Sequence, residues 1–175
     1  MMRNKNYINS EIDWIGDIPK DWKVSSLRFF SEIKRGCGYQ LLVPYEENKH
    51  TSYEKVIRIG DFDIFNPIKY KYDSNFETYR IKKGDILIGG TGHYFGKSIL
   101  ATKEMNNYVH SYNIIKINLK RNIPYFVEKY LSSSKIRDQL NISALGSGQP
   151  FIDIQGLKEL KILIPPIEEQ TLISK

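Results

Sequence analysis

The chain has 175 residues, which is enough for one domain with a hydrophobic core of its own. Apolar residues make up 41% of it and charged residues 26%, a balance that excludes a mainly disordered chain. Lys and Arg outnumber Asp and Glu by 26 to 20, and this net charge of +6 favours an anionic partner such as nucleic acid.

The N-terminal segment, residues 1–13, is polar, and we expect it to be a flexible lead-in to the domain. It lacks the apolar stretch of a signal peptide, and no apolar run reaches the roughly 18 residues of a membrane helix. These features predict a cytoplasmic protein with no membrane partner. Residues 14–22, WIGDIPKDW, place a glycine and a proline between two tryptophans, which predicts an ordered arm packed on the body.

Residues 27–33 predict a short helix that begins after two serines and is closed at Gly36. Residues 36–54 are polar with little periodicity and indicate a long loop. That loop contains Cys37, the single cysteine, so no intramolecular disulfide can form and a reducing compartment is expected. Because no cluster of histidines or cysteines lies near it, Cys37 is expected to be structural.

Short runs of β-branched and aromatic residues dominate the middle of the chain and predict strands. Two of these runs alternate apolar with polar side chains, as half-buried strands do. The connections between runs are too short for crossover helices, which favours antiparallel or mixed pairing over a doubly wound sheet. The predicted strands are residues 55–59, 68–72, 85–90, 98–102 and 112–119.

The last third of the chain changes to helical patterns. Pro124 suits the first turn of a helix, and apolar side chains follow at helical spacing as far as Leu131. Asp153 is expected to cap a short helix, which precedes a strand that two prolines end. A last helix is expected over residues 166–175, with two glutamates near the positive end of its dipole. The predicted fold is a mixed α/β (α+β) domain over residues 14–165, with a curved, mainly antiparallel sheet and flanking helices.

Two segments resemble enzyme motifs without matching them. Residues 89–98, GGTGHYFGKS, differ from a phosphate-binding loop because Thr91 stands where that loop needs a glycine. The segment after them predicts a strand, not the helix whose N-terminus would hold phosphate. Residues 122–125, Asn-Ile-Pro-Tyr, differ from the Asn-Pro-Pro-Tyr loop of adenine methyltransferases and are interpreted as a helix start.

No pattern of acid–base or metal-ligating residues stands out. The histidines, His50, His93 and His110, are scattered and share no metal-binding spacing. Asp61 and Asp63 lie two residues apart and could share one face of a strand. A solvated turn is the favoured interpretation, because catalysis also needs a pocket and a partner group. The sequence therefore predicts no catalytic centre, no metal and no cofactor.

Four segments, taken in order, are similar to those of type I restriction–modification specificity (S) subunits. They are WIGDIPKDW, VIRIGDF, KKGDILIGGTGHYFGKSIL and GSGQPFIDIQGLKELKILIPPIEEQ, within residues 14–170. The most specific parts are GDIL…TG…GK and the ending LK.L.I.IPP.EEQ. The resemblance implies a non-catalytic DNA target-recognition domain. It also implies that S-adenosylmethionine, ATP and Mg are bound only by partner subunits.

In that family a full subunit carries two such domains, each followed by a long helix, and each domain reads half of a split DNA target. The resemblance therefore implies four partners: double-stranded DNA, methyltransferase (M) subunits, restriction (R) subunits, and a second specificity half or a homodimer. Residues 166–175 would begin the spacer and dimerisation helix, with partner-facing residues Ile167, Gln170, Leu172 and Ile173. Two alternatives stay open: a recognition-domain fragment of a fused restriction–methylation enzyme, and an assembly module without sequence readout.

Three loops are expected to form the DNA-reading surface, because base-reading residues usually lie on positioned loops. Lys and Arg would contact phosphates, while loop side chains would contact base edges. Gly92 and Gly96 would permit close approach of the backbone to DNA, and Gln149 would pair with adenine. The candidates are Arg35, Tyr39, Gln40, Lys49 and His50 in the first loop, Thr91, Gly92, His93, Tyr94 and Lys97 in the second, and Ser147 and Gln149 in the third.

Overall fold

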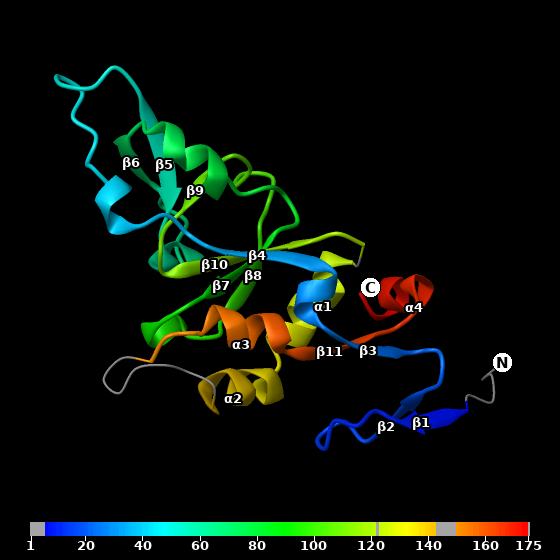
Figure 1. Cartoon of the computed structure of the whole chain (residues 1–175). Coiled ribbons are helices and arrows are strands. Elements are labelled where there is room, and N and C mark those ends of the chain that lie inside the picture. The colour runs from blue at the N-terminus through cyan, green and yellow to red at the C-terminus, as the bar shows by residue number, and fades with distance from the viewer. Residues whose placement is uncertain (1–5, 122, 143–149, 175) are drawn as a thin grey trace.

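A four-stranded antiparallel sheet lies at the centre of the molecule, in the order β4-β10-β7-β8 (Figure 1). The computed structural model describes residues 6–121, 123–142 and 150–174 of the chain. The strands of the central sheet are β4 (Ser31–Arg35), β10 (Ile114–Leu119), β7 (Ile86–Gly89) and β8 (Ser98–Leu100). β10 and β7 are its interior strands, and apolar residues dominate both, as burial within a sheet requires.

Alternate side chains of the central strands face two different hydrophobic clusters, because successive residues of a strand point to opposite faces. Ile86 and Ile115 belong to the larger cluster, which three helices cover on one face of the sheet. Leu87 and Ile114 belong to a second cluster on the other face. The covering helices are α1 (Pro124–Leu131), α2 (Ser134–Ile142) and α3 (Ile154–Glu159).

A smaller sheet of three strands, in the order β6-β5-β9, lies beside the central one. β5 (Tyr53–Ile57) pairs antiparallel with β6 (Ile68–Lys71) and parallel with β9 (Val109–His110). A third cluster of buried residues, Cys37, Val56, Phe76 and Val109, packs under this sheet. Burial raises the pKa of the Cys37 thiol to about 11, so this cysteine is part of the core, as its sequence context predicts.

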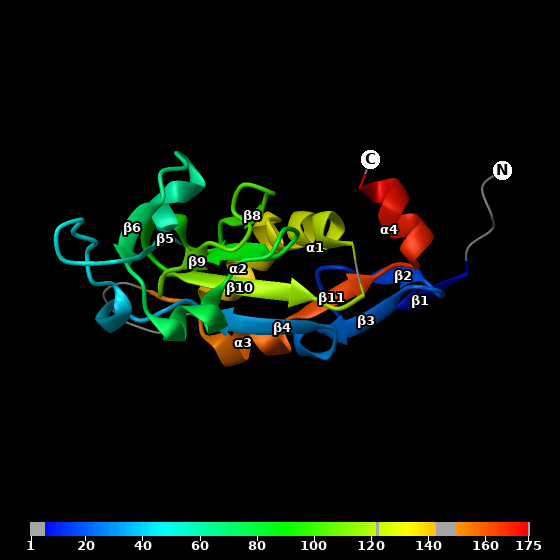
Figure 2. The same ribbon diagram turned by 90° about the horizontal axis from the view of Figure 1, so that it is seen from above.

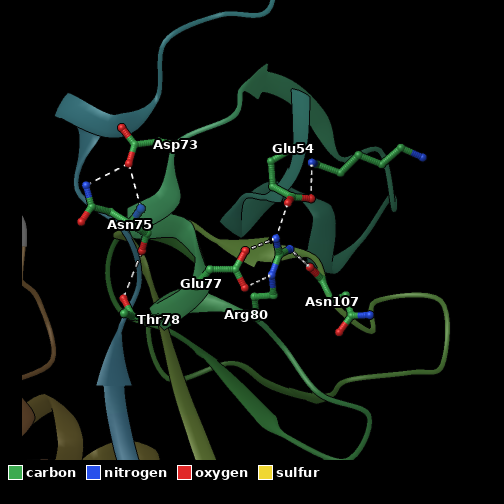
Figure 3. A network of polar contacts seen from close by, with 8 residues as sticks. Glu54, Asp73, Asn75, Glu77, Thr78, Arg80 and Asn107 are labelled. Atoms are coloured by element: carbon green, nitrogen blue, oxygen red, sulfur yellow. Dashed lines mark hydrogen bonds and ion pairs between the residues drawn. The ribbon is translucent and has the colours of Figure 1, made fainter. Parts of the chain in front are cut away.

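One guanidinium ties the smaller sheet together (Figure 3). Arg80 Nη2 lies 2.7 Å from both Glu77 Oε1 and Glu54 Oε2. Its Nη1 donates to the carbonyl of Asn107 at 2.6 Å. Hydrogen bonds to these two carboxylates raise the pKa of Arg80 further above its usual range. The 3-10 turn before Arg80, strand β5 and the loop before β9 are thereby held at one point.

Two small antiparallel sheets and the C-terminal helix lie at the other end of the molecule (Figure 2). β1 (Tyr7–Asn9) pairs with β2 (Asp17–Pro19), and β3 (Lys23–Ser26) pairs with β11 (Lys161–Ile164). The chain then continues into α4 (Ile167–Ile173). In the part of the chain that the structure describes, no helix has the length and apolar character needed to cross a bilayer.

The predicted arm is confirmed, and two side chains attach it to the body. The Trp14 ring lies 6.3 Å from the Tyr130 ring of α1. Trp22 Nε1 donates to Glu169 Oε2 in α4 at 2.9 Å. The arm thereby contacts both a core helix and the start of the C-terminal helix.

Elements with a strong local signal are confirmed. Pro124 starts α1, and the Asp153 side chain accepts hydrogen bonds from Gln155 N at 3.2 Å and Gly156 N at 2.7 Å. The five predicted strands correspond to β5, β6, β7, β8 and β10, and the strand before the two prolines is β11. The mixed, mainly antiparallel class is also confirmed, and the strands divide among four sheets.

The helix predicted over residues 27–33 is wrong. A single 3-10 turn, Leu27–Phe29, is followed by strand β4. Pairing with β10 over the whole length of β4 overrides the weak local preference for a helix. The loop expected over residues 36–54 contains the 3-10 turn Tyr39–Leu41 and the first residues of β5. Tyr7–Asn9, in the segment expected to be flexible, form strand β1.

Candidate nucleic-acid interface

A glycine-rich turn joins β7 to β8 and presents several of the predicted contact residues. Its 3-10 turn is Gly92–Tyr94, and the connection favours glycine at two positions, because Gly92 has φ +63° and Gly96 has φ +72°. Gly89 N donates to the carbonyl of Lys97 at 2.8 Å and closes the hairpin. The chain after the turn is strand β8, so the interpretation against a phosphate-binding loop is confirmed.

An exposed ion pair compensates the one cation on this turn. Lys97 pairs with Asp63 Oδ1, and the Tyr94 hydroxyl donates to Asp63 Oδ2 at 2.8 Å. The Lys97 hydrogen bond holds the pKa of Asp63 below its usual range, and the bond to Asp63 raises the pKa of Tyr94. Both partners of the ion pair are more than a third exposed, so it is weak, and a phosphate can compete for Lys97 at little cost.

The turn is clamped to the segment that follows the third predicted loop. Thr91 and Phe151 form a β-bridge, and the Thr91 hydroxyl donates to the carbonyl of Pro150 at 3.1 Å. Ile152 N donates to the carbonyl of Gly90 at 2.9 Å. The structure thus brings together the second loop and the C-terminal edge of the third. Ser147 and Gln149 themselves lie outside the described residues.

Arg35 connects this clamp to the first loop. Its Nη2 donates to the carbonyl of Ile152 at 2.6 Å, and its guanidinium lies 5.1 Å from the centre of the Tyr112 ring. The Tyr112 ring in turn lies 5.9 Å from that of Tyr39, and Tyr39 and its neighbour Gln40 are exposed. Arg35 was predicted as a DNA contact, and the structure shows its guanidinium engaged within the protein.

The other two residues of the first loop lie apart from this cluster, on a local turn. Lys49 pairs with Glu46 at 2.6 Å, and His50 Nδ1 accepts a hydrogen bond from Glu46 N at 2.9 Å. The His50 ring lies 6.0 Å from the Tyr45 ring. Figures 1 and 2 place this loop at the end of the molecule opposite α4.

The carboxylates and the buried histidine serve local structure. Asp61 is buried, and its side chain accepts a hydrogen bond from Arg58 N at 2.7 Å within its own turn. Asp63 is held by Lys97. The predicted turn is confirmed, but it is solvated only at Asp63, because Asp61 is 4% exposed. His110 Nδ1 lies 2.6 Å from the Tyr79 carbonyl, and burial lowers the pKa of this histidine to about 4. Within the described ranges, no three metal-ligating side chains come together.

Residues 19–175 match the family described as Type I restriction modification DNA specificity domain. The chain belongs to this family. Such a domain is the non-catalytic, sequence-selecting part of a type I restriction–modification system.

Proteins similar to this specificity domain come from both archaea and bacteria. The chain is 27% identical to the putative type I restriction enzyme MjaX specificity subunit of Methanocaldococcus jannaschii, covering 99% of this chain and 42% of that protein. It is 24% identical to the EcoBI specificity subunit of Escherichia coli, covering 87% of this chain and 33% of that protein. The chain thus spans less than half the length of these relatives.

Two solved structures share the fold of this specificity domain. The HsdS subunit from Thermoanaerobacter tengcongensis superimposes with a TM-score of 0.67 at 20% identity, covering 90% of this chain and 41% of that one. The S subunit from M. genitalium gives a TM-score of 0.57 at 19% identity, covering 87% of this chain and 37% of that one. These likenesses agree with the mixed, mainly antiparallel architecture.

In this specificity domain the start of α4 is fixed to the body by Gln170, which the sequence predicts to face a partner. Gln170 is 2% exposed, accepts from Ile123 N at 3.1 Å and donates to the carbonyl of Pro165 at 2.8 Å. Its amide therefore anchors the helix within its own domain. Ile167, Leu172 and Ile173 are exposed, as a partner-facing position requires.

Sequence reasoning missed two exposed aromatic residues of the specificity domain, Tyr112 and Phe151. Tyr112 was placed inside a predicted strand, but β10 begins two residues later and leaves it in a turn. Phe151 follows Pro150 at the edge of a loop. Each residue lies in a short turn-like triplet, Ser-Tyr-Asn at Tyr112 and Gln-Pro-Phe at Phe151. Only the fold, however, places Tyr112 next to Arg35 and Phe151 next to Thr91.

Proposed function

We propose that this chain reads one half of a split DNA target and so directs adenine methylation and restriction by partner subunits. Family membership supports DNA sequence recognition. The observation that carries the assignment of the surface is the clamp at Thr91, because it fixes the glycine turn beside residues 150–152. This places Thr91, a candidate base-reading residue, next to Phe151 from a separate part of the sequence.

Each predicted contact residue has a chemical role in the proposal, including Lys49, which lies on a separate turn. Lys97 and Lys49 exchange their carboxylate partners for DNA phosphates, which supplies affinity without sequence preference. Thr91, His93 and Gln149 read base edges. The domain holds the duplex while the methyltransferase subunit flips an adenine into its own pocket. S-adenosylmethionine, ATP and Mg belong to partner subunits in this scheme.

The proposed assembly contains two reading domains. The relatives are more than twice as long as this chain, and a second specificity half or a second copy would supply the other half-site. Exposed Ile167, Leu172 and Ile173 support pairing through α4. M subunits, and R subunits for cleavage, would bind to this scaffold in the cytoplasm, where the host DNA lies.

A salt titration with duplexes of known sequence tests the proposal. The chain, assembled with its methyltransferase subunit, is expected to prefer one sequence, which methylation mapping in the host identifies. Its affinity should fall with a log–log slope of about −0.9 per phosphate contact. A flat salt response beside tight binding to the methyltransferase would favour the assembly module. A methyltransferase encoded in the same reading frame would favour the fused enzyme.

A further inference from the structure

Phe151 is a partly exposed aromatic side chain on the surface formed by the glycine turn (residues 89–97) and residues 150–152. We call this surface the clamped surface. Phe151 is 41% exposed, while its neighbour Ile152 is fully buried in the main core. Phe151 is not isolated, because Arg35 binds the carbonyl of its neighbour Ile152 and packs over Tyr112, whose ring contacts that of Tyr39. Tyr112 and Tyr39 are also exposed, and exposed apolar side chains that lie near one another often mark a contact surface.

The backbone on both sides of Phe151 is fixed, which sets the direction in which its side chain leaves the main chain. Pro150 accepts from the Thr91 hydroxyl, and the Ile152 carbonyl accepts from Arg35. The β-bridge to Thr91 holds Phe151 itself. A contact residue that is ordered before binding loses little conformational entropy when the partner arrives.

We infer that Phe151 is a specificity residue that contacts the C5-methyl group of thymine in the major groove. The inference rests on the proposed function. The thymine methyl is the apolar feature of the major-groove edge, and a phenylalanine ring is one of the side chains that matches it. A wedge that separates base pairs needs a protruding side chain. More than half of Phe151 is buried and its backbone is held, which favours the methyl contact.

Arg35 acts in this arrangement as a positioning residue. Its guanidinium donates to the carbonyl of Ile152, the residue after Phe151, and packs over the Tyr112 ring. Replacing it with Gln should reduce discrimination for the thymine methyl. The salt slope of binding should stay unchanged, whereas loss of a phosphate contact would lower it by about 0.9.

The test replaces each thymine of the half-site, one at a time, by uracil, which removes only the methyl group. Affinities are measured for the chain assembled with its methyltransferase subunit. At one position the wild type should lose about fourfold in affinity, the effect of one buried methyl group. Phe151→Ala should lose a similar factor on the thymine duplex and become insensitive to uracil. Phe151→Leu, which keeps an apolar side chain, should retain part of the discrimination and controls for folding.

Phe29→Ala is the matched control, because Phe29 is an exposed phenylalanine outside the clamped surface and should leave the uracil effect intact. Sequence-specific binding by the wild type with no uracil effect at any position would overturn the inference and leave the proposed function standing. Equal losses for Phe151→Ala on both duplexes, with reduced DNA bending by energy transfer between labelled ends, would overturn it in favour of a wedge. Absence of any sequence preference in the wild type would overturn the proposed function itself.

Discussion

Two ion-pair sites in this domain use the same chemistry in different surroundings. In the three-stranded sheet, Arg80 is 23% exposed and pairs with Glu54, which is 16% exposed. At the glycine turn, Lys97 and Asp63 are 41% and 48% exposed. A partly buried charge cannot return to water when its partner is lost, but an exposed one can. The first site therefore holds the fold, and the second can exchange its internal partner for an external anion.

The largest expected effect is on the Arg80 site. Arg80→Met removes the guanidinium and leaves the half-buried Glu54 without its partner, which should lower the free energy of unfolding by about 2–4 kcal/mol. Denaturant unfolding measures the loss. Arg28→Met, which breaks an exposed pair with Glu159, is the matched control and should cost about 0.5 kcal/mol or less. Equal costs for the two variants would remove the distinction between the two kinds of site.

His110, in the same sheet, should give the domain a pH dependence. Burial lowers its folded pKa to about 4 from an ordinary value of 6.5, so between these pH values the unfolded chain binds more protons. The free energy of unfolding should therefore fall as pH drops from 6.5 to 4, by up to about 3 kcal/mol from this group. His110→Asn lacks the titrating ring, and its stability curve should be flatter in that window. Parallel curves for the two proteins would contradict the prediction.

Gln170 is a buried amide side chain at the other end of the molecule. It tests whether burial or position in the fold decides how much a substitution lowers the free energy of unfolding. Gln170→Ala leaves the Ile123 amide and the Pro165 carbonyl without their side-chain partner, which should cost about 2 kcal/mol in unfolding free energy. Leu172→Ala in the same helix is the control, since its side chain is exposed and should cost about 0.5 kcal/mol or less. A small change in unfolding free energy for Gln170→Ala would contradict the anchoring role and favour the predicted partner-facing role.

The parts of the fold that the sequence predicted are those whose cause is local. Pro124 and Asp153 act within one turn of their own helices, so their signals were readable. β4 forms because β10 pairs with it, more than 70 residues away, and its own residues gave a helical pattern. The role of Gln170 likewise depends on Ile123, which no helical periodicity identifies.

The candidate interface could be predicted only in part, because some of its features are local and others depend on contacts between distant segments. Glycines and a lysine marked the turn after β7, and the structure confirms its shape. The cluster around Arg35 joins residues from three separate segments, and only folding brings them together. Gln170, in the C-terminal family signature, anchors α4. Among the proposed base-reading residues that the structure describes, His93 is exposed and Thr91 is partly exposed, and no sequence pattern marks them.

The smallest effect on stability, and the sharpest on binding, is expected at Asp63. Asp63→Asn removes the charge that compensates Lys97 and should strengthen binding to every DNA sequence severalfold at low salt, with stability nearly unchanged because the pair is exposed. Lys97→Ala should weaken binding to all sequences alike and lower the salt slope by about 0.9. Electrophoretic or fluorescence titrations at several salt concentrations measure both.

The double variant separates a direct role of Asp63 from one that acts through Lys97. If Asp63 only competes with phosphate for that cation, Asp63→Asn should have little effect once Lys97 is alanine, because the charge it released is gone. An unchanged gain in the double variant would mean that Asp63 repels the DNA backbone by itself. In either case Asp63 changes DNA affinity and leaves stability nearly unchanged, whereas Arg80 changes stability.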